Sequence, residues 1–247
     1  MEFLAVAVRF ILKIIRMKRM NDERTLKDLL YEQVARIGKA IASPKRLELL
    51  EMLAQGEKSV ETLTAELSID VKLASAHLKA LRDANLVQAR RDGKYMFYSL
   101  SGRDVAQLGV TLRTVAEEHL LDMRLALQKL VSAPDQLTKT SRADLLAQAR
   151  SGLVVVIDVR PQSEFDAAHL PFARSLPLAE LEQRISELPP GVDIVAYCRG
   201  PFCLMSDAAV KLLLARGYRA HKTQDGVSEW QAAGFAIESA TAIAHQN

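Results

Sequence analysis

Two cysteines in one short segment, Cys198 and Cys203, are the residues of this sequence best suited to covalent chemistry. The apolar run 193–198 predicts a buried parallel strand and 204–216 predicts a helix, so Cys198 lies where a strand end enters a tight loop. Unpaired backbone N–H groups and the positive end of the helix dipole favour the nucleophilic thiolate at such a position. The alternative is a structural cysteine that packs as a small hydrophobe.

The length and composition define the setting of this segment. A chain of 247 residues fits two cores of ordinary size, and a hydrophobic content of 49% with mixed charge predicts globular domains. The two clustered cysteines indicate a reducing, cytoplasmic compartment rather than a disulfide framework. Residues 1–100 hold 18 Lys and Arg against 13 Asp and Glu, and this excess suits a phosphate-bearing partner.

The N-terminal half is predicted to be mainly helical with one hairpin. Two short helices across a tight turn form a helix-turn-helix, and two extended runs around Asp92-Gly93 form a β-wing. The apolar periodicity and the capping residues place the helices at 26–41, from Pro44 to a stop at Gly56, at 60–67, at 71–83 and, as one long helix, at 103–131.

One face of the helix 71–83 is basic and polar, as a helix that reads the major groove of DNA requires. The same charges would also suit an ordinary solvated surface, but the helix-turn-helix and the basic wing favour double-stranded operator DNA as the partner. The expected DNA-contacting residues are Lys72, Ser75, His77, Lys79, Arg82, Arg90, Arg91 and Lys94.

The helices 26–41 and 103–131 each carry an apolar stripe that so small a domain cannot cover, which predicts a homodimer formed through them. Glu118, His119 and Asp122 on the last helix do not form a convincing set of metal ligands. We expect neither a resident metal nor a cofactor.

Beyond residue 131 the pattern changes to alternating strands and helices, which predicts an α/β domain with a central parallel sheet. The predicted organisation is an extension at 1–20, a winged-helix domain at 21–131, a linker at 132–140, the α/β domain at 141–240 and a tail at 241–247. The extension is amphipathic but interrupted by charge, so no membrane span is expected. It is interpreted as a segment ahead of a start at Met17 or Met20, with a basic surface anchor as the alternative.

Residues 21–130 resemble the ArsR family of winged-helix repressors through SPKRLELLEML, SAHLKALRDANLV and RRDGKYMFYSL. The resemblance implies a homodimer that binds an operator and releases it when an inducer is sensed. Many relatives sense metals through cysteines near the position of Val60, and this chain lacks them.

Residues 141–238 resemble a single rhodanese domain through IDVRPQSEFDAAHLPFARSLPL, VAYCRGPFC and DGVSEWQAAGFAIE. The resemblance implies that Cys198 accepts a sulfane sulfur as a persulfide. It also implies that Asp158 and Arg160 support the loop. The loop that cradles the persulfide consists of Arg199, Gly200, Pro201, Phe202 and Cys203.

One position departs from the rhodanese pattern: Cys203 stands where many relatives have an arginine that holds an oxyanion. Thiosulfate is therefore a less secure donor than a polysulfide or a low-molecular-weight persulfide, unless Arg199 supplies part of the charge. Cys203 is either a second thiol that attacks the persulfide or a packing residue. Phosphatase chemistry, known for this fold, is set aside because Leu204 occupies the place of its arginine.

Three hypotheses follow for the whole chain. The first is a transcriptional repressor that senses reactive sulfur species through a persulfide on Cys198. The second is a rhodanese-type sulfurtransferase with a sulfur donor, a thiol acceptor and an attached DNA-binding domain. The third, a metal or metalloid sensor using Cys198, Cys203 and His221, has few ligands to support it.

Overall fold

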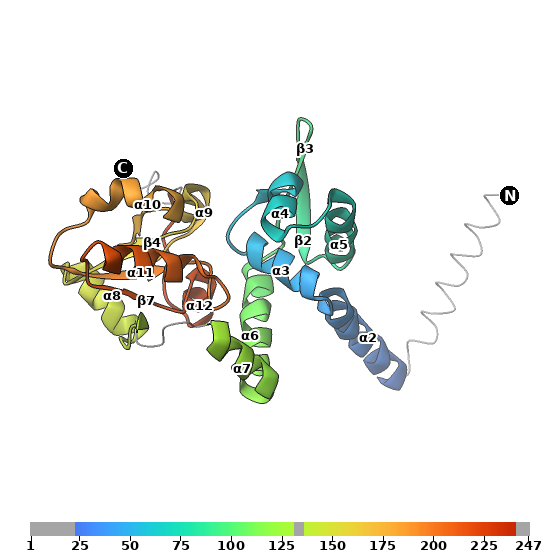
Figure 1. Cartoon of the computed structure of the whole chain (residues 1–247). Coiled ribbons are helices and arrows are strands. Elements are labelled where there is room, and N and C mark those ends of the chain that lie inside the picture. Colours follow the sequence, from blue (N-terminus) through green and yellow to red (C-terminus); the bar gives the residue numbers. More distant parts are fainter. Residues whose placement is uncertain (1–22, 131–135, 241–247) are drawn as a thin grey trace.

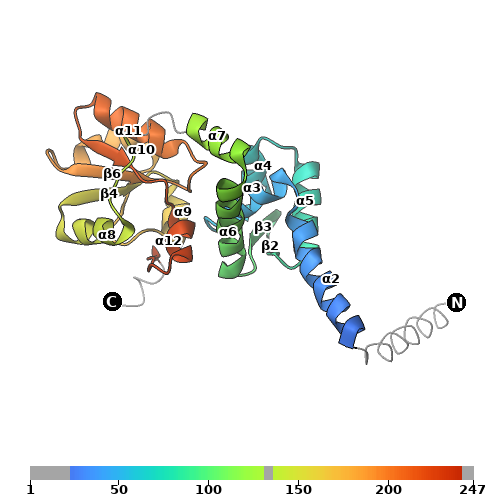
Figure 2. The ribbon, with the colours of Figure 1, turned by 90° about the horizontal axis from the view of Figure 1, so that it is seen from below.

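The computed structural model describes residues 23–130 and 136–240. The described residues form two groups of elements that lie side by side, with helix α6 (Arg103–His119) of the first group facing helix α12 (Val227–Ala232) of the second (Figures 1 and 2). The predicted extension 1–20 and the tail 241–247 lie outside the described residues. No helix among the described residues is long and apolar enough to cross a membrane.

The first group is the predicted winged helix. Helices α3 (Pro44–Leu53), α4 (Val60–Leu67) and α5 (Val71–Asp83) pack on a small antiparallel sheet, while α2 (Glu23–Ile41) extends away from it (Figure 1). Side chains cap the helix-turn-helix: Ser59 accepts a hydrogen bond from the Thr62 amide, and Asp70 accepts one from the Leu73 amide. Its core includes Leu49, Leu63, Leu78 and Leu81, each with no exposed surface.

The wing is a two-stranded hairpin of β2 (Val87–Asp92) and β3 (Tyr95–Leu100), with the short β1 (Lys58–Ser59) on the other side of β3. Gly93 begins the two-residue turn. Its φ is 57°, a positive value that glycine adopts without steric cost. The hairpin projects beyond α4 and α5 (Figure 1).

The prediction of one helix over 103–131 was wrong, because the helix breaks at Leu120 into α6 and α7 (Leu121–Leu130). Leu120 is extended, and the Arg124 guanidinium donates a hydrogen bond of 2.7 Å to the freed carbonyl of Glu118. The break turns α7 away from the axis of α6 (Figure 2), and Leu130 lies beside the second group. No glycine or proline marks this position, so the sequence pattern gave no sign of it.

The second group has the predicted parallel sheet, in the order β5 (Arg174–Ser175), β4 (Val154–Asp158), β6 (Asp193–Tyr197), β7 (Ala220–Lys222). Both faces are covered, which explains the continuous apolar runs of β4 and β6. Helices α10 (Leu178–Arg184) and α11 (Met205–Ala215) pack on one face. A short 3-10 turn, η2 (Ile185–Glu187), directly follows α10. Helices α8 (Arg142–Ser151) and α12 pack on the other face, where Trp230 is buried.

Two helices and the path of the linker were not predicted from the sequence. The helices are α8, which precedes β4, and α9 (Gln162–Ala167), which follows β4. The described part of the predicted linker runs along the sheet edge, where the Thr138 amide donates a hydrogen bond of 2.8 Å to the Lys222 carbonyl.

Candidate functional site: a thiolate loop against the DNA-binding domain

Cys198 directly follows β6 at the start of the loop that leads into α11. Its Sγ lies 3.3 Å from the Ser206 hydroxyl oxygen and 3.4 Å from the Cys203 carbonyl oxygen. The residue is 2% exposed, whereas Cys203 is half-buried. The strand end therefore holds the Cys198 sulfur inside a closed loop.

Hydrogen bonds make Cys198 a thiolate at neutral pH. A hydrogen bond from the Cys203 side chain lowers the pKa of Cys198 to about 6, against the opposing effect of burial, and the Ser206 hydroxyl and the amides of Ser206 and Gly200 lower it further. The same hydrogen bond to Cys198, together with burial, raises the pKa of Cys203, which stays a protonated thiol. The loop thus pairs one nucleophile with one S–H donor.

A glycine packs against the back of this loop. A Cβ atom at Gly226 would lie 2.7 Å from the carbonyl oxygens of Cys198 and Arg199, so only a glycine fits there without movement of the backbone. The Glu229 carboxylate accepts a hydrogen bond of 2.7 Å from the Gly226 amide and forms an ion pair with Arg113 of α6. The backbone of the thiolate loop is thereby tied to a helix of the winged domain.

Arg199 does not serve the thiolate in the way the sequence suggested. Its guanidinium forms ion pairs of 2.5 Å with Glu164 on α9 and 3.0 Å with Glu66 on α4 of the winged domain. Burial lowers the pKa of Arg199, but the two carboxylates raise it by more, so the pKa lies above its ordinary value. The sequence left open that Arg199 supplies part of the charge of an oxyanion-holding arginine; in the structure its charge is held by two glutamates.

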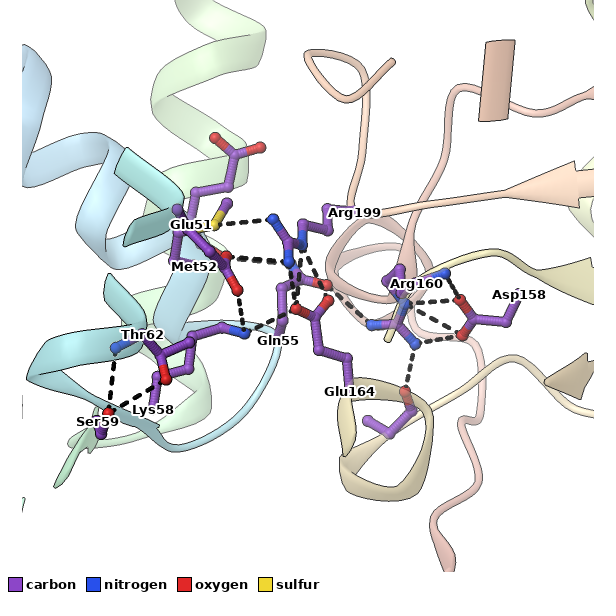
Figure 3. A network of polar contacts seen from close by, with 12 residues as sticks. Glu51, Met52, Gln55, Lys58, Ser59, Thr62, Asp158, Arg160, Glu164 and Arg199 are labelled. Carbon is purple, nitrogen blue, oxygen red and sulfur yellow. Dashed lines mark hydrogen bonds and ion pairs between the residues drawn. The ribbon is translucent and has the colours of Figure 1, made fainter. Parts of the chain in front are cut away.

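Four charged side chains join the two domains in one cluster, here called the interdomain charge cluster: Lys58, Glu66, Glu164 and Arg199 (Figure 3). Lys58 of β1 forms an ion pair of 2.7 Å with Glu164, and both side chains are almost completely buried. Burial raises the pKa of Glu164, but the hydrogen bonds and charges of Arg199 and Lys58 outweigh it and hold the pKa below its ordinary value. Removing one partner would leave an unpaired buried charge, which is costly.

The Asp158 and Arg160 side chains form an ion pair that is completely buried, with Arg160 Nε 2.9 Å from Asp158 Oδ1. A further hydrogen bond of 2.9 Å reaches from Arg160 to the Gln55 side chain of the winged domain, and another of 2.7 Å to the carbonyl of Ala168 (Figure 3). The pair thus supports both the sheet end and the contact between domains.

The expected DNA-contacting side chains lie together on α5 and on the wing. Seven of the eight are exposed, and His77 is half-buried. Some of their charge is shared locally, since Lys79 pairs with Asp83, and Arg90 pairs with Glu57 and Asp92. Within the described residues, no group of three or more His, Cys, Asp and Glu could hold a metal ion.

Sequence reasoning missed the residues of the winged domain that contact the thiolate loop or the side chains around it: Met52, Gln55, Lys58, Glu66 and Arg113. Their partners lie 105 to 147 positions away along the chain, so no local spacing connects them. The sulfur of Met52, for example, lies 3.2 Å from a guanidinium nitrogen of Arg199 (Figure 3).

The fold and the thiolate loop together define a DNA-binding regulator with a rhodanese-like domain attached. The sequence pattern of the bacterial regulatory protein arsR family matches residues 43–89, and that of the rhodanese-like domain matches residues 141–233. The HTH-type transcriptional regulator Rv0324 of Mycobacterium tuberculosis is 40% identical over 92% of this chain and 99% of its own length. The chain therefore belongs to the arsR family of bacterial regulatory proteins and carries a rhodanese-like domain after its DNA-binding region.

Two further relatives match a smaller part of the chain. The biofilm growth-associated repressor of Agrobacterium fabrum is 43% identical over 31% of this chain and 65% of its own length. A solution structure shows the homodimeric winged helix-turn-helix DNA-binding domain of Mb0332 from Mycobacterium bovis. It is 44% identical and covers 40% of this chain and 90% of that chain, with a TM-score of 0.37.

Proposed function

We propose that the chain is a homodimeric transcriptional repressor whose operator binding is controlled by a persulfide on Cys198. The observation that carries this proposal is the short path from the thiolate to the DNA-reading domain. Arg199, the neighbour of Cys198, holds Glu66 at the end of α4, and α5 begins four residues after α4 ends. A change in the loop is thus passed on to the helix-turn-helix by direct contact.

The sulfur-loading step needs only a donor with a sulfane sulfur, such as a polysulfide or a low-molecular-weight persulfide. The Cys198 thiolate attacks the outer sulfur of R–S–SH; a new S–S bond forms, the old S–S bond breaks, and RS⁻ leaves with the bonding electron pair. The product is Cys198–S–SH. With Arg199 held by two carboxylates, the loop offers no free guanidinium to an oxyanion, which favours these donors over thiosulfate.

An added sulfur has little room in this loop. Cys198 is only 2% exposed, and its Sγ already lies 3.3 Å from the Ser206 hydroxyl oxygen and 3.4 Å from the Cys203 carbonyl oxygen. We expect the outer sulfur of the persulfide to push residues 199–203 outward. That movement displaces the Arg199 guanidinium from Glu66 and releases the contact that holds α4.

Exposed apolar side chains on α2, α6 and α7 support the homodimer, and the Mycobacterium bovis neighbour is described as homodimeric. A second copy of the chain packed against these helices would cover apolar side chains whose exposure to water is unfavourable. They are Leu26, Leu30, Tyr31 and Val34 on α2, Leu112 and Val115 on α6, and Leu121 and Leu125 on α7.

The test is a titration of the DNA upstream of the protein's own gene with reduced or polysulfide-treated protein, with intact mass spectrometry to count added sulfur atoms. We expect one added sulfur at Cys198 and weakened binding in the wild type, and unchanged tight binding of Cys198→Ser in both conditions. Catalytic turnover with cyanide or a thiol acceptor, without any change in DNA binding, would instead favour the sulfurtransferase. A persulfide on Cys198 that leaves both DNA binding and turnover unaffected would contradict both functions.

A further inference from the structure

A cavity of about 400 Å³ lies between the two domains, next to the thiolate loop but separate from the sulfur itself. Helices α3 and α6 form most of its wall, and Arg199, Phe202 and Glu229 close it from the rhodanese-like domain. A volume of this size, at a domain interface and with mainly apolar walls, is typical of a site for a small organic molecule.

A glycine in the interior of a helix lines this space. Gly109 lies in the middle of α6 and lines the cavity, where glycine costs about 1 kcal/mol relative to alanine. A Cβ atom at Gly109 would have no neighbour within 4 Å. Neither backbone conformation nor close packing within the described residues requires a glycine there, and a large side chain at this position would project into the open space of the cavity.

The charges around the cavity leave one carboxylate without a partner. Arg113 pairs with Glu229, Arg199 pairs with Glu66 and Glu164, and Glu48 pairs with Lys45. The Glu51 side chain, in contrast, forms no hydrogen bond or ion pair with any described residue. Its carboxylate points away from the interdomain charge cluster (Figure 3).

The surroundings of Glu51 favour a cation as its partner. Burial raises the pKa of Glu51, and Arg113 and Arg199 only partly oppose this effect. A half-buried carboxyl group gains most from a ligand that brings a positive hydrogen-bond donor. An anionic ligand would find both arginines of the wall already occupied by carboxylates.

We propose that this cavity binds a small apolar amine, with its hydrocarbon body between α3 and α6 and its ammonium group at Glu51. Such a ligand contacts Arg199 and Phe202, which adjoin Cys198 and Cys203 in the chain. The cavity is thus a second input to the thiolate loop, distinct from sulfur loading. This inference does not depend on the sulfur-sensing proposal, because amine binding is measured directly.

The experiment is a calorimetric titration of the full chain with 2-phenylethylamine and, as the anion of similar shape, 3-phenylpropanoate. We expect saturable binding of the amine at one site per chain and at least about tenfold weaker binding of the carboxylate, the ratio of one charge-assisted hydrogen bond. Glu51→Gln should remove most of this preference while leaving the cavity intact. Equal affinity for both probes, or no saturable binding of the amine, would overturn the proposal.

A pair of glycine variants separates filling of the cavity from other effects. Gly109→Leu places a side chain into the space and should abolish amine binding. Gly38→Leu on α2 is the matched control, because Gly38 is also a helical glycine with no atom near its Cβ position, but it does not line the cavity. If both variants bind the amine equally, or if Gly109→Leu converts a dimer into a monomer in light scattering, the space does not belong to a small ligand.

Discussion

The hydrogen bond from Cys203 to Cys198 can be tested by measuring the pH at which Cys198 becomes reactive. With a pKa of about 6, roughly 90% of Cys198 is thiolate at pH 7, whereas a cysteine with an ordinary pKa of about 8.5 is only about 3% thiolate. A donor stabilises the charged form, so its removal raises the pKa. We expect Cys203→Ala to move the midpoint upward and Cys203→Ser, which keeps an O–H donor, to move it less.

The midpoint is a better measure than the rate at one pH. A return to a pKa of about 8.5 would reduce the thiolate population by about 30-fold at pH 7. The more basic thiolate would, however, be about tenfold more nucleophilic, with a Brønsted coefficient of 0.4 to 0.5. The two effects partly cancel and leave the rate at pH 7 only about threefold lower, whereas the midpoint moves by the full change in pKa.

The assay is iodoacetamide alkylation from pH 4.5 to 10, with peptide mass spectrometry to follow Cys198 separately from Cys203. Ser206→Ala serves as a second test, because the Ser206 hydroxyl is another donor to the same sulfur. The midpoint pH should be lowest in the wild type, higher in Cys203→Ser and highest in Cys203→Ala. A wild-type midpoint near 8.5, or the same midpoint in Cys203→Ala as in the wild type, would refute this account of the thiolate.

Three further substitutions test the support of the loop and the contact between domains. Asp158→Ala leaves the buried Arg160 charge unpaired and should lower the free energy of unfolding by about 3–5 kcal/mol in urea titrations; a loss under 1 kcal/mol would contradict the role given to the pair. Gly226→Ala forces a Cβ atom against the backbone after Cys198 and should slow persulfide formation, measured by mass spectrometry; an unchanged rate would show that the loop does not need this contact. Glu164→Gln should destabilise the protein at neutral pH. Because the pKa of Glu164 is lowered in the folded state, the wild type is the more stable protein above the ordinary pKa of a glutamate. That difference in stability should vanish as the pH falls through the lowered pKa. A stability difference that stays constant with falling pH would exclude an ionic role for Glu164.

The sequence by itself determined the local elements and the chemistry of the loop. Alternating and continuous apolar runs depend on neighbouring residues, so they predicted the helix-turn-helix, the wing and the parallel strands around Cys198. The basic face of α5 follows from helical periodicity alone. For the same reason the sequence could indicate a cysteine at a strand end, where backbone amides and a helix terminus favour a thiolate.

Only the tertiary structure decided which residues form ion pairs with the charged side chain of the loop. The sequence left open a role for Arg199 in holding an oxyanion, but Glu164 and Glu66 bind its guanidinium, and Glu66 comes from a helix more than 130 residues earlier in the chain. The cavity beside Gly109 has the same origin, since it depends on how the two domains meet. Contacts between distant segments arise from the docking of complete surfaces, and no spacing within either segment records them.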